Sequence, residues 1–118
     1  MSCRVLVIED EVIVAMMVED MLSELGCKVA AIATHFTQAL ELAQALDIDF
    51  AVLDVNLNGK LSLPVADALA ARGIPFAFAT GYGGKALSGA YAIAPTLQKP
   101  FQIEDLSEVL RRSGLAVG

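Results

Sequence analysis

The sequence predicts an α/β domain in which a parallel sheet is covered by helices on both faces. Short apolar runs of strand length alternate with segments of helical periodicity, giving five βα units without a repeat or a linker. The 118 residues are enough for one domain, and 56% hydrophobic residues supply a substantial core. Together with 19% charged residues, this balance excludes intrinsic disorder.

The first half of the chain gives two strands and two helices in alternation. Residues 5–8 form a continuous apolar run, as expected of a strand that is covered on both faces. Residues 11–25 then switch to helical spacing, with one apolar stripe that ends before Gly26. Residues 28–33 are expected to form the second strand, and the apolar spacing from Phe36 to Leu46 predicts the second helix.

The second half continues the alternation. Residues 50–53 are a third buried strand, Asn58-Gly59 turns the chain, and a helix is expected from 62 to 72. Strands are expected at 75–79 and 96–98, and a last helix at 103–112. Four of the nine glycines fall between Gly81 and Gly89, so the fourth helix should be short or irregular.

Charge and composition exclude several classes of function. The formal net charge of −6 argues against a nucleic-acid partner and against a surface that binds anionic lipid. Acidic residues follow the first strand too soon for a signal peptide, and the apolar run from Val12 to Val18 is too short to span a membrane. Two cysteines and one histidine make neither a disulfide framework nor a nitrogen-and-sulfur metal site. We therefore expect a reduced cytoplasmic protein.

Polar side chains follow the strands at one edge of the expected sheet, which is where ligands bind in such folds. They are Glu9, Asp10 and Glu11 after the first strand, Asp54 after the third, Thr80 after the fourth and Lys99 after the fifth. Carboxylates packed together repel each other unless a cation or a proton intervenes, and a cluster of oxygen ligands favours Mg²⁺. The Lys99 ammonium and the Thr80 hydroxyl suit the oxygens of a phosphoryl group.

Asp54 is the expected nucleophile of this cluster. No serine, cysteine or histidine stands at these strand ends, and the strand before Asp54 should lie in the middle of the sheet. Attack of a carboxylate on phosphorus gives an aspartyl phosphate. Glu11 is interpreted as an acid that suits the first turn of the following helix.

Four motifs make the chain resemble the receiver domains of bacterial response regulators over nearly all of its length. They are Ile8-Glu9-Asp10, Leu53-Asp54-Val55-Asn56, Ala79-Thr80-Gly81 and Lys99-Pro100-Phe101. The resemblance implies a CheY-like, flavodoxin-like (βα)5 fold with strand order 2-1-3-4-5. It implies Mg²⁺ bound by Asp10, Asp54 and the backbone carbonyl of Asn56, with Glu9 acting through water. It also implies phosphate contacts from Thr80 and Lys99 and a cis bond before Pro100.

The sequence departs from the family pattern at two places. Leu57-Asn58-Gly59 replaces the common Met-Pro-Gly, and Thr96 stands where the family has a switch tyrosine or phenylalanine. Tyr82 and Tyr91 are candidates to take over the switch role, but they are interpreted as exposed loop aromatics. The run from Phe76 to Tyr82 resembles the subclass named for its Phe-Ala-Thr-Gly motif (FATGUY), whose kinases are often of the HWE type.

We expect residues 1–118 to be a single receiver domain without an effector domain, and not an enzyme beyond its own phosphorylation and dephosphorylation. A histidine kinase or phosphotransfer protein would donate a phosphoryl group to Asp54, and the protein, as a monomer or weak dimer, would then bind a downstream protein target. Met16, Met17 and Met21 are expected to serve core and interface packing. One alternative is a Mg²⁺-dependent phosphohydrolase, which usually has an aspartate where Asn56 stands. The other alternative is a pseudo-receiver that binds partners without phosphorylation.

Overall fold

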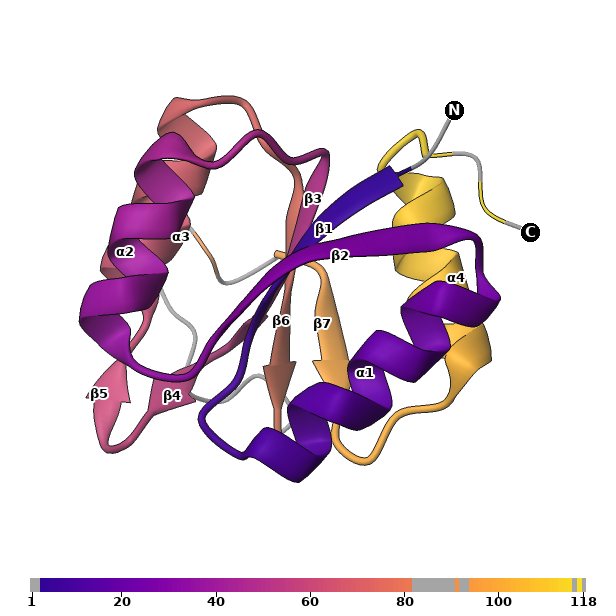
Figure 1. The fold of residues 1–118 in the computed structure, drawn as a ribbon, viewed down its shortest axis with the longest axis horizontal. Helices are drawn as coiled ribbons and strands as arrows, with labels where there is room; N and C mark the ends of the chain where they lie inside the picture. The colour runs from indigo at the N-terminus through magenta and orange to yellow at the C-terminus, as the bar shows by residue number, and fades with distance from the viewer. Residues whose placement is uncertain (1–2, 82–90, 92–93, 116, 118) are drawn as a thin grey trace.

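A five-stranded parallel sheet forms the middle layer of the molecule, between two pairs of helices (Figure 1). The computed structural model describes residues 3–81, 91, 94–115 and 117. Helices α2 (Phe36–Ala45) and α3 (Leu63–Ala71) cover one face of the sheet, and α1 (Val12–Glu24) and α4 (Ile103–Arg112) cover the other. This arrangement confirms the three-layer α/β prediction.

The strand order confirms the expected order 2-1-3-4-5. The strands of the sheet run β2-β1-β3-β6-β7, with bounds β1 (Cys3–Ile8), β2 (Cys27–Ala33), β3 (Phe50–Asp54), β6 (Phe76–Thr80) and β7 (Thr96–Gln98). All four pairings are parallel. The expected irregular fourth helix would fall between β6 and β7, on residues that lie mostly outside the described ones.

A two-stranded hairpin follows β3, of which the sequence predicts only the turn at Asn58-Gly59. It consists of β4 (Asn56–Leu57) and β5 (Lys60–Leu61), which pair in antiparallel register around Asn58-Gly59. Asn58 has φ +53° and Gly59 has φ +86°, the left-handed conformation that tight hairpin turns require at both positions. β3 is one residue longer than expected, because the β3–β6 ladder continues to Asp54. β6 has the expected length but begins and ends one residue later, because the β6–β7 ladder continues to Thr80.

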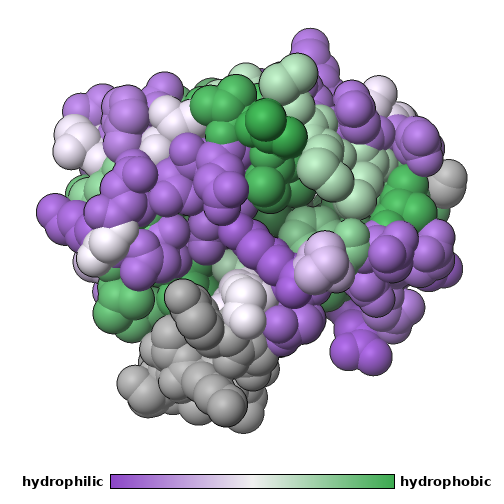
Figure 2. All heavy atoms as spheres, turned by 90° about the horizontal axis from the view of Figure 1, so that it is seen from below, coloured by the Kyte–Doolittle hydropathy of each residue, from purple (hydrophilic) through white to green (hydrophobic). Residues whose placement is uncertain are grey.

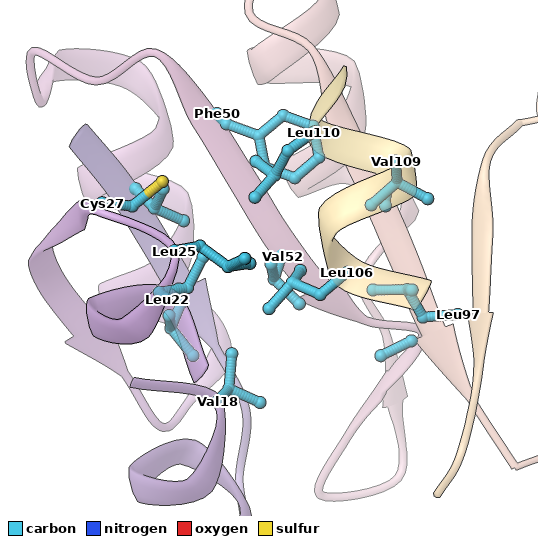
Figure 3. Packing of buried hydrophobic residues seen from close by; sticks show 14 of the residues in the cluster. Val18, Leu22, Leu25, Cys27, Phe50, Val52, Leu97, Leu106, Val109 and Leu110 are labelled. Carbon is cyan, nitrogen blue, oxygen red and sulfur yellow. The ribbon is translucent and has the colours of Figure 1, made fainter. Parts of the chain in front are cut away.

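Each face of the sheet has its own hydrophobic cluster. Figure 3 shows the cluster between the sheet and helices α1 and α4, where Val18 and Leu22 face Val52 and Leu106. The cluster on the other face includes Phe78, which is fully buried beneath α2 and α3. Because β1 and β3 contribute residues to both clusters, their continuous apolar sequences are explained by burial on two faces.

The two cysteines lie side by side in the first cluster. Cys3 and Cys27 are register partners on β1 and β2, and both are buried as free thiols. Burial, followed by the contact with Cys27, raises the pKa of Cys3 to about 12, so its thiol stays protonated at neutral pH. These two thiols are therefore part of the core.

Helix α1 exposes apolar side chains on its outer surface. Val12, Ile13, Met16 and Met17 are each more than half exposed, whereas Met21 packs against the core. The expectation of core packing is therefore wrong for Met16 and Met17, because more than half of each residue is exposed, whereas interface packing stays a prediction for them. No helix among the described residues combines the length and apolar character needed to span a membrane.

Candidate functional site

Strand register brings the predicted polar residues to one edge of the sheet. Ile8 is level with Leu53, so Glu9 follows β1 beside Asp54 at the end of β3. Asp54 is level with Ala79, next to Thr80 at the end of β6. Thr80 is level with Gln98, and Lys99 follows directly. Figure 2 looks onto this edge and shows a hydrophilic band across it, beside a hydrophobic area.

Three carboxylates converge at this edge. One ligand oxygen each from Glu9, Asp10 and Asp54 lies within 4.8 Å of the others. Glu9 is 3% exposed and Asp54 is 8% exposed, so two of the three charges are largely shielded from water. Carboxylates this close repel one another in a partly dry site, and a positive charge among them is favoured.

Lys99 supplies a positive charge to two of these carboxylates. Its Nζ donates to Glu9 Oε1 at 2.7 Å and to Asp54 Oδ2 at 3.0 Å. Its backbone N–H donates to the Thr80 carbonyl at 2.9 Å, and the bond between Lys99 and Pro100 is cis. Burial acts to lower the pKa of Lys99, but the hydrogen bonds to Glu9 and Asp54 outweigh it and raise the pKa, so the ammonium stays charged.

Burial disfavours the charged form of Glu9. Its burial raises its pKa to about 7, even though the hydrogen bond from Lys99 acts in the opposite direction. The Glu11 backbone N–H also donates to Glu9, at 3.1 Å to Oε2. The Glu9 side chain is therefore held between Lys99 and the first residues that lead into α1.

Asp10 has a different environment from Glu9. The backbone N–H of Asn58 donates to Asp10 Oδ2 at 3.0 Å. Burial acts to raise the pKa of Asp10, but hydrogen bonds, first among them the one from Asn58, lower it below its ordinary value. Asp10 is therefore an ionised carboxylate at the partly exposed rim of the cluster.

The hairpin that follows Asp54 is fastened to the site at its base. The fully buried Ser62 hydroxyl lies 2.6 Å from the Asp54 carbonyl oxygen and 3.1 Å from that of Val55, and donates to them. Asn56, between base and tip, donates its N–H to Asp54 Oδ1 at 3.3 Å. Sequence reasoning missed Ser62. A serine directly before a helix indicates a cap, and no local pattern points to a carbonyl eight residues earlier.

The residues at the expected switch positions differ in burial. Thr80 is buried at the end of β6, and Thr96 is exposed on β7. Tyr91 is half-buried rather than an exposed loop aromatic, because its ring packs edge-on against Phe76 and Phe78. Its hydroxyl donates to Asp67 Oδ1 on α3 at 2.6 Å. Tyr82, the other candidate aromatic, lies outside the described residues.

The donor set fits a hard divalent cation. The converging side chains offer carboxylate oxygens, which Mg²⁺ prefers, and the adjacent Asn56 is the exposed residue of β4. No cluster with three His, Cys, Asp or Glu ligands other than Glu9, Asp10 and Asp54 occurs in the described part of the chain.

Comparisons with known proteins agree with this geometry. The chain is 32% identical over 110 residues to the transcriptional regulatory protein PdtaR of Mycobacterium tuberculosis, an alignment that covers 87% of this chain and 52% of PdtaR. It is also 32% identical over 121 residues to the phyllosphere-induced regulator PhyR of Methylorubrum extorquens, covering 96% of this chain and 44% of PhyR. The chain thus spans about half the length of these curated relatives.

A solved structure with similar coverage of both chains is that of SdrG from Sphingomonas melonis Fr1. It superposes with a TM-score of 0.85 at 39% sequence identity, and covers 97% of this chain and 98% of SdrG. The model of the response regulator receiver domain family matches residues 5–111 of the sequence. The strand order, the acidic edge of the sheet and this match together show that the chain belongs to the response regulator receiver domain family.

Proposed function

We propose that Asp54 accepts a phosphoryl group from the phosphohistidine of a histidine kinase or phosphotransfer protein, in a Mg²⁺-dependent reaction. The observation that carries the proposal is the Asp54 carboxylate itself. Its Oδ2 lies 3.0 Å from the Lys99 ammonium, and Glu9 and Asp10 place further oxygens within 4.8 Å. Beside a carboxylate surrounded in this way, the charge of an incoming phosphoryl group is balanced by the ammonium and by a cation on the acidic side chains.

The cation would be held by Asp10, Asp54 and the Asn56 carbonyl, with Glu9 acting through water, and it would neutralise charge on the phosphoryl oxygens. Lys99 is placed to bind another phosphoryl oxygen, since its Nζ already contacts Asp54. The Thr80 side chain ends the neighbouring strand and is the hydroxyl nearest in register to this group.

The transfer itself needs only an exchange of bonds at phosphorus. An oxygen of Asp54 forms a bond to phosphorus as the bond from phosphorus to the donor histidine nitrogen breaks, and the electron pair of that bond returns to the imidazole. The Ser62 hydroxyl donates a hydrogen bond to the Asp54 backbone carbonyl, and this contact helps to fix the position of the nucleophile.

A protein donor is favoured by the apolar surface beside the site. The exposed side chains of Val12, Ile13, Met16 and Met17 lie on the helix that directly follows Glu9 and Asp10. A groove of about 320 Å³ continues this surface, between α1 and the segment from Lys99 to Phe101. Figure 2 shows the hydrophobic area next to the hydrophilic edge. Exposed apolar patches of this kind mark interfaces with proteins.

The phosphohydrolase alternative is less well supported. Such an enzyme needs an acid or base near the nucleophile, and Asn56 offers an amide whose oxygen already accepts from the Gly59 N–H at 2.7 Å. A pseudo-receiver would have no use for the contacts that Lys99 makes with Glu9 and Asp54. We further propose that phosphorylation changes which downstream protein binds.

Intact-mass measurement with acetyl phosphate tests the acceptor. One phosphoryl group should be taken up in the presence of Mg²⁺ and none in EDTA, and Asp54→Asn should abolish the uptake. Retention of the full signal in Asp54→Asn would overturn the assignment.

A second comparison tests the protein donor. Ile13→Asp should slow transfer from a phosphorylated histidine phosphotransfer domain while uptake from acetyl phosphate is unchanged. Gln44→Asp is the matched control, because it adds the same charge at an exposed position on α2, across the sheet. If both variants accept from the protein donor at the wild-type rate, α1 is not the docking surface.

A further inference from the structure

Lys99 and the tip of the β4–β5 hairpin bind different carboxylates of the site. Lys99 Nζ contacts Glu9 and Asp54. Asp10 Oδ2 accepts instead from the Asn58 backbone N–H, at 3.0 Å. A carboxylate has two oxygens with about four lone-pair sites, so this hydrogen bond leaves Asp10 free to bind a cation as well.

The Asn58 N–H points at Asp10 because of an unusual backbone conformation. With φ +53°, Asn58 is in the left-handed region, which asparagine and glycine adopt far more readily than other residues. Its side chain fastens the tip a second time, since Asn58 Nδ2 donates to the Thr34 carbonyl at 3.4 Å. The tip of the hairpin is therefore attached both to Asp10 and to the end of β2.

The same hairpin carries Asn56, whose carbonyl is expected to be a ligand of the cation. Its base is fixed by the Ser62 hydroxyl on the Asp54 carbonyl. Its second strand contacts α2, because Lys60 Nζ lies 4.3 Å from the centre of the Phe36 ring. With base and tip both attached, the position of Asn56 relative to Asp10 and Asp54 is set by protein contacts alone.

We propose that Asn58 is a positioning residue of the cation site. Its left-handed backbone keeps Asp10 and the hairpin with Asn56 together before any cation binds. The inference rests on the proposed function only in assuming that a divalent cation binds at Glu9, Asp10 and Asp54. It predicts that the backbone conformation at position 58, rather than the asparagine amide, determines cation affinity.

Three proteins distinguish these contributions: wild type, Asn58→Gly and Asn58→Ala. Glycine adopts the left-handed conformation without strain, so Asn58→Gly should bind Mg²⁺ within about twofold of wild type. Alanine is strained there, so part of the Asn58→Ala population should have a displaced hairpin that the cation must first restore. Its Mg²⁺ affinity should fall by about five- to tenfold, as expected when the competent fraction drops by that factor.

Isothermal titration with MgCl₂ measures the affinities, and hydrogen exchange in EDTA measures the hairpin directly. The amide of residue 58 should exchange slowly in wild type and Asn58→Gly, and faster in Asn58→Ala. A purely structural role would lower the melting temperature of Asn58→Ala equally in EDTA and in saturating Mg²⁺, with no change in the dissociation constant. That result would overturn the inference, as would an equal loss of affinity in both variants.

The outcomes separate this inference from the proposed function. If wild type binds Mg²⁺ and accepts phosphate but Asn58→Ala binds Mg²⁺ equally well, only the inference fails. If wild type binds Mg²⁺ and the variants behave as expected but Asp54 takes up no phosphoryl group, the proposed function fails and the inference stands. Absence of Mg²⁺ binding in wild type would overturn both.

Discussion

Replacing Lys99 with methionine removes the positive charge of the site while keeping the length of the side chain. In the native protein Lys99 Nζ lies 2.7 Å from Glu9 and 3.0 Å from Asp54, whose side chains are only 4% and 11% exposed. A hydrogen bond to a charged group contributes roughly 1.5–3 kcal/mol to stability. Lys99 itself is 22% exposed, and removing water from its ammonium has a cost, so we expect Lys99→Met to lower the unfolding free energy by about 2 kcal/mol in EDTA.

Magnesium should reduce this difference. Without the ammonium, Glu9 and Asp54 repel each other, and a divalent cation gains more by binding among them than it does in wild type. The stabilisation by Mg²⁺, which follows the ratio of free cation to its dissociation constant, should therefore be larger in Lys99→Met. The same variant should accept phosphate from acetyl phosphate about 100-fold more slowly, because the developing charge loses a fixed partner.

Urea denaturation in EDTA and in saturating MgCl₂ measures both effects. Lys28→Met is the control, since it removes an exposed lysine on β2 and should change the unfolding free energy by less than about 0.5 kcal/mol. Equal stability of Lys99→Met and wild type in EDTA would refute the electrostatic argument. A Mg²⁺ stabilisation no larger than that of wild type would refute the competition between the ammonium and the cation.

Three further substitutions test other contacts, each by urea denaturation. Ser62→Ala should lower the unfolding free energy by about 1–2 kcal/mol, because the Asp54 carbonyl loses its hydroxyl donor while the Val55 carbonyl keeps the Ser62 backbone N–H; an unchanged midpoint would show that water replaces the hydroxyl. Tyr91→Phe should lower the unfolding free energy by about 1 kcal/mol at pH 7, because the hydrogen bond to Asp67 is lost. Burial and then Asp67 raise the pKa of Tyr91 from 10.0 to about 12, so this contribution is present below pH 10 and lost as the pH rises through 12, where the two proteins should converge. Phe78→Ala should lower the unfolding free energy by about 3–5 kcal/mol, because it leaves a cavity in the core. A loss below about 1 kcal/mol would mean that neighbouring side chains move to fill the cavity.

The order of elements could be predicted because its signals are local. The strands around Val52 and Phe78 are short apolar runs followed by a polar residue, and the last helix has a clear apolar stripe with the predicted bounds. The site residues were recognisable for the same reason, since Glu9, Asp10 and Asp54 come directly after buried apolar runs. Strand ends in a parallel sheet share one edge, so sequence position alone was enough to group them.

The contacts within the site could not be predicted, because they depend on strand register and loop conformation. Glu9 and Lys99 are 90 residues apart, and only the alignment of β1, β3, β6 and β7 brings the carboxylate within 2.7 Å of the ammonium. The Asn58 contact with Asp10 uses a backbone N–H, which every residue except proline possesses. The asparagine therefore indicates the turn, but not which oxygen this N–H contacts.

Tyr91 and the methionines of α1 show the same limit for side chains. Tyr91 resembles a loop aromatic in sequence, and it is half-buried because β6 places Phe76 and Phe78 on one face of the sheet beside it. Met16 and Met17 are apolar like core residues, yet they are exposed, because only one stripe of α1 packs against the sheet. The sequence by itself determined which residues form strands, helices and the acidic edge. The tertiary structure decided which side chains meet, because burial and contact depend on neighbours that are distant along the chain.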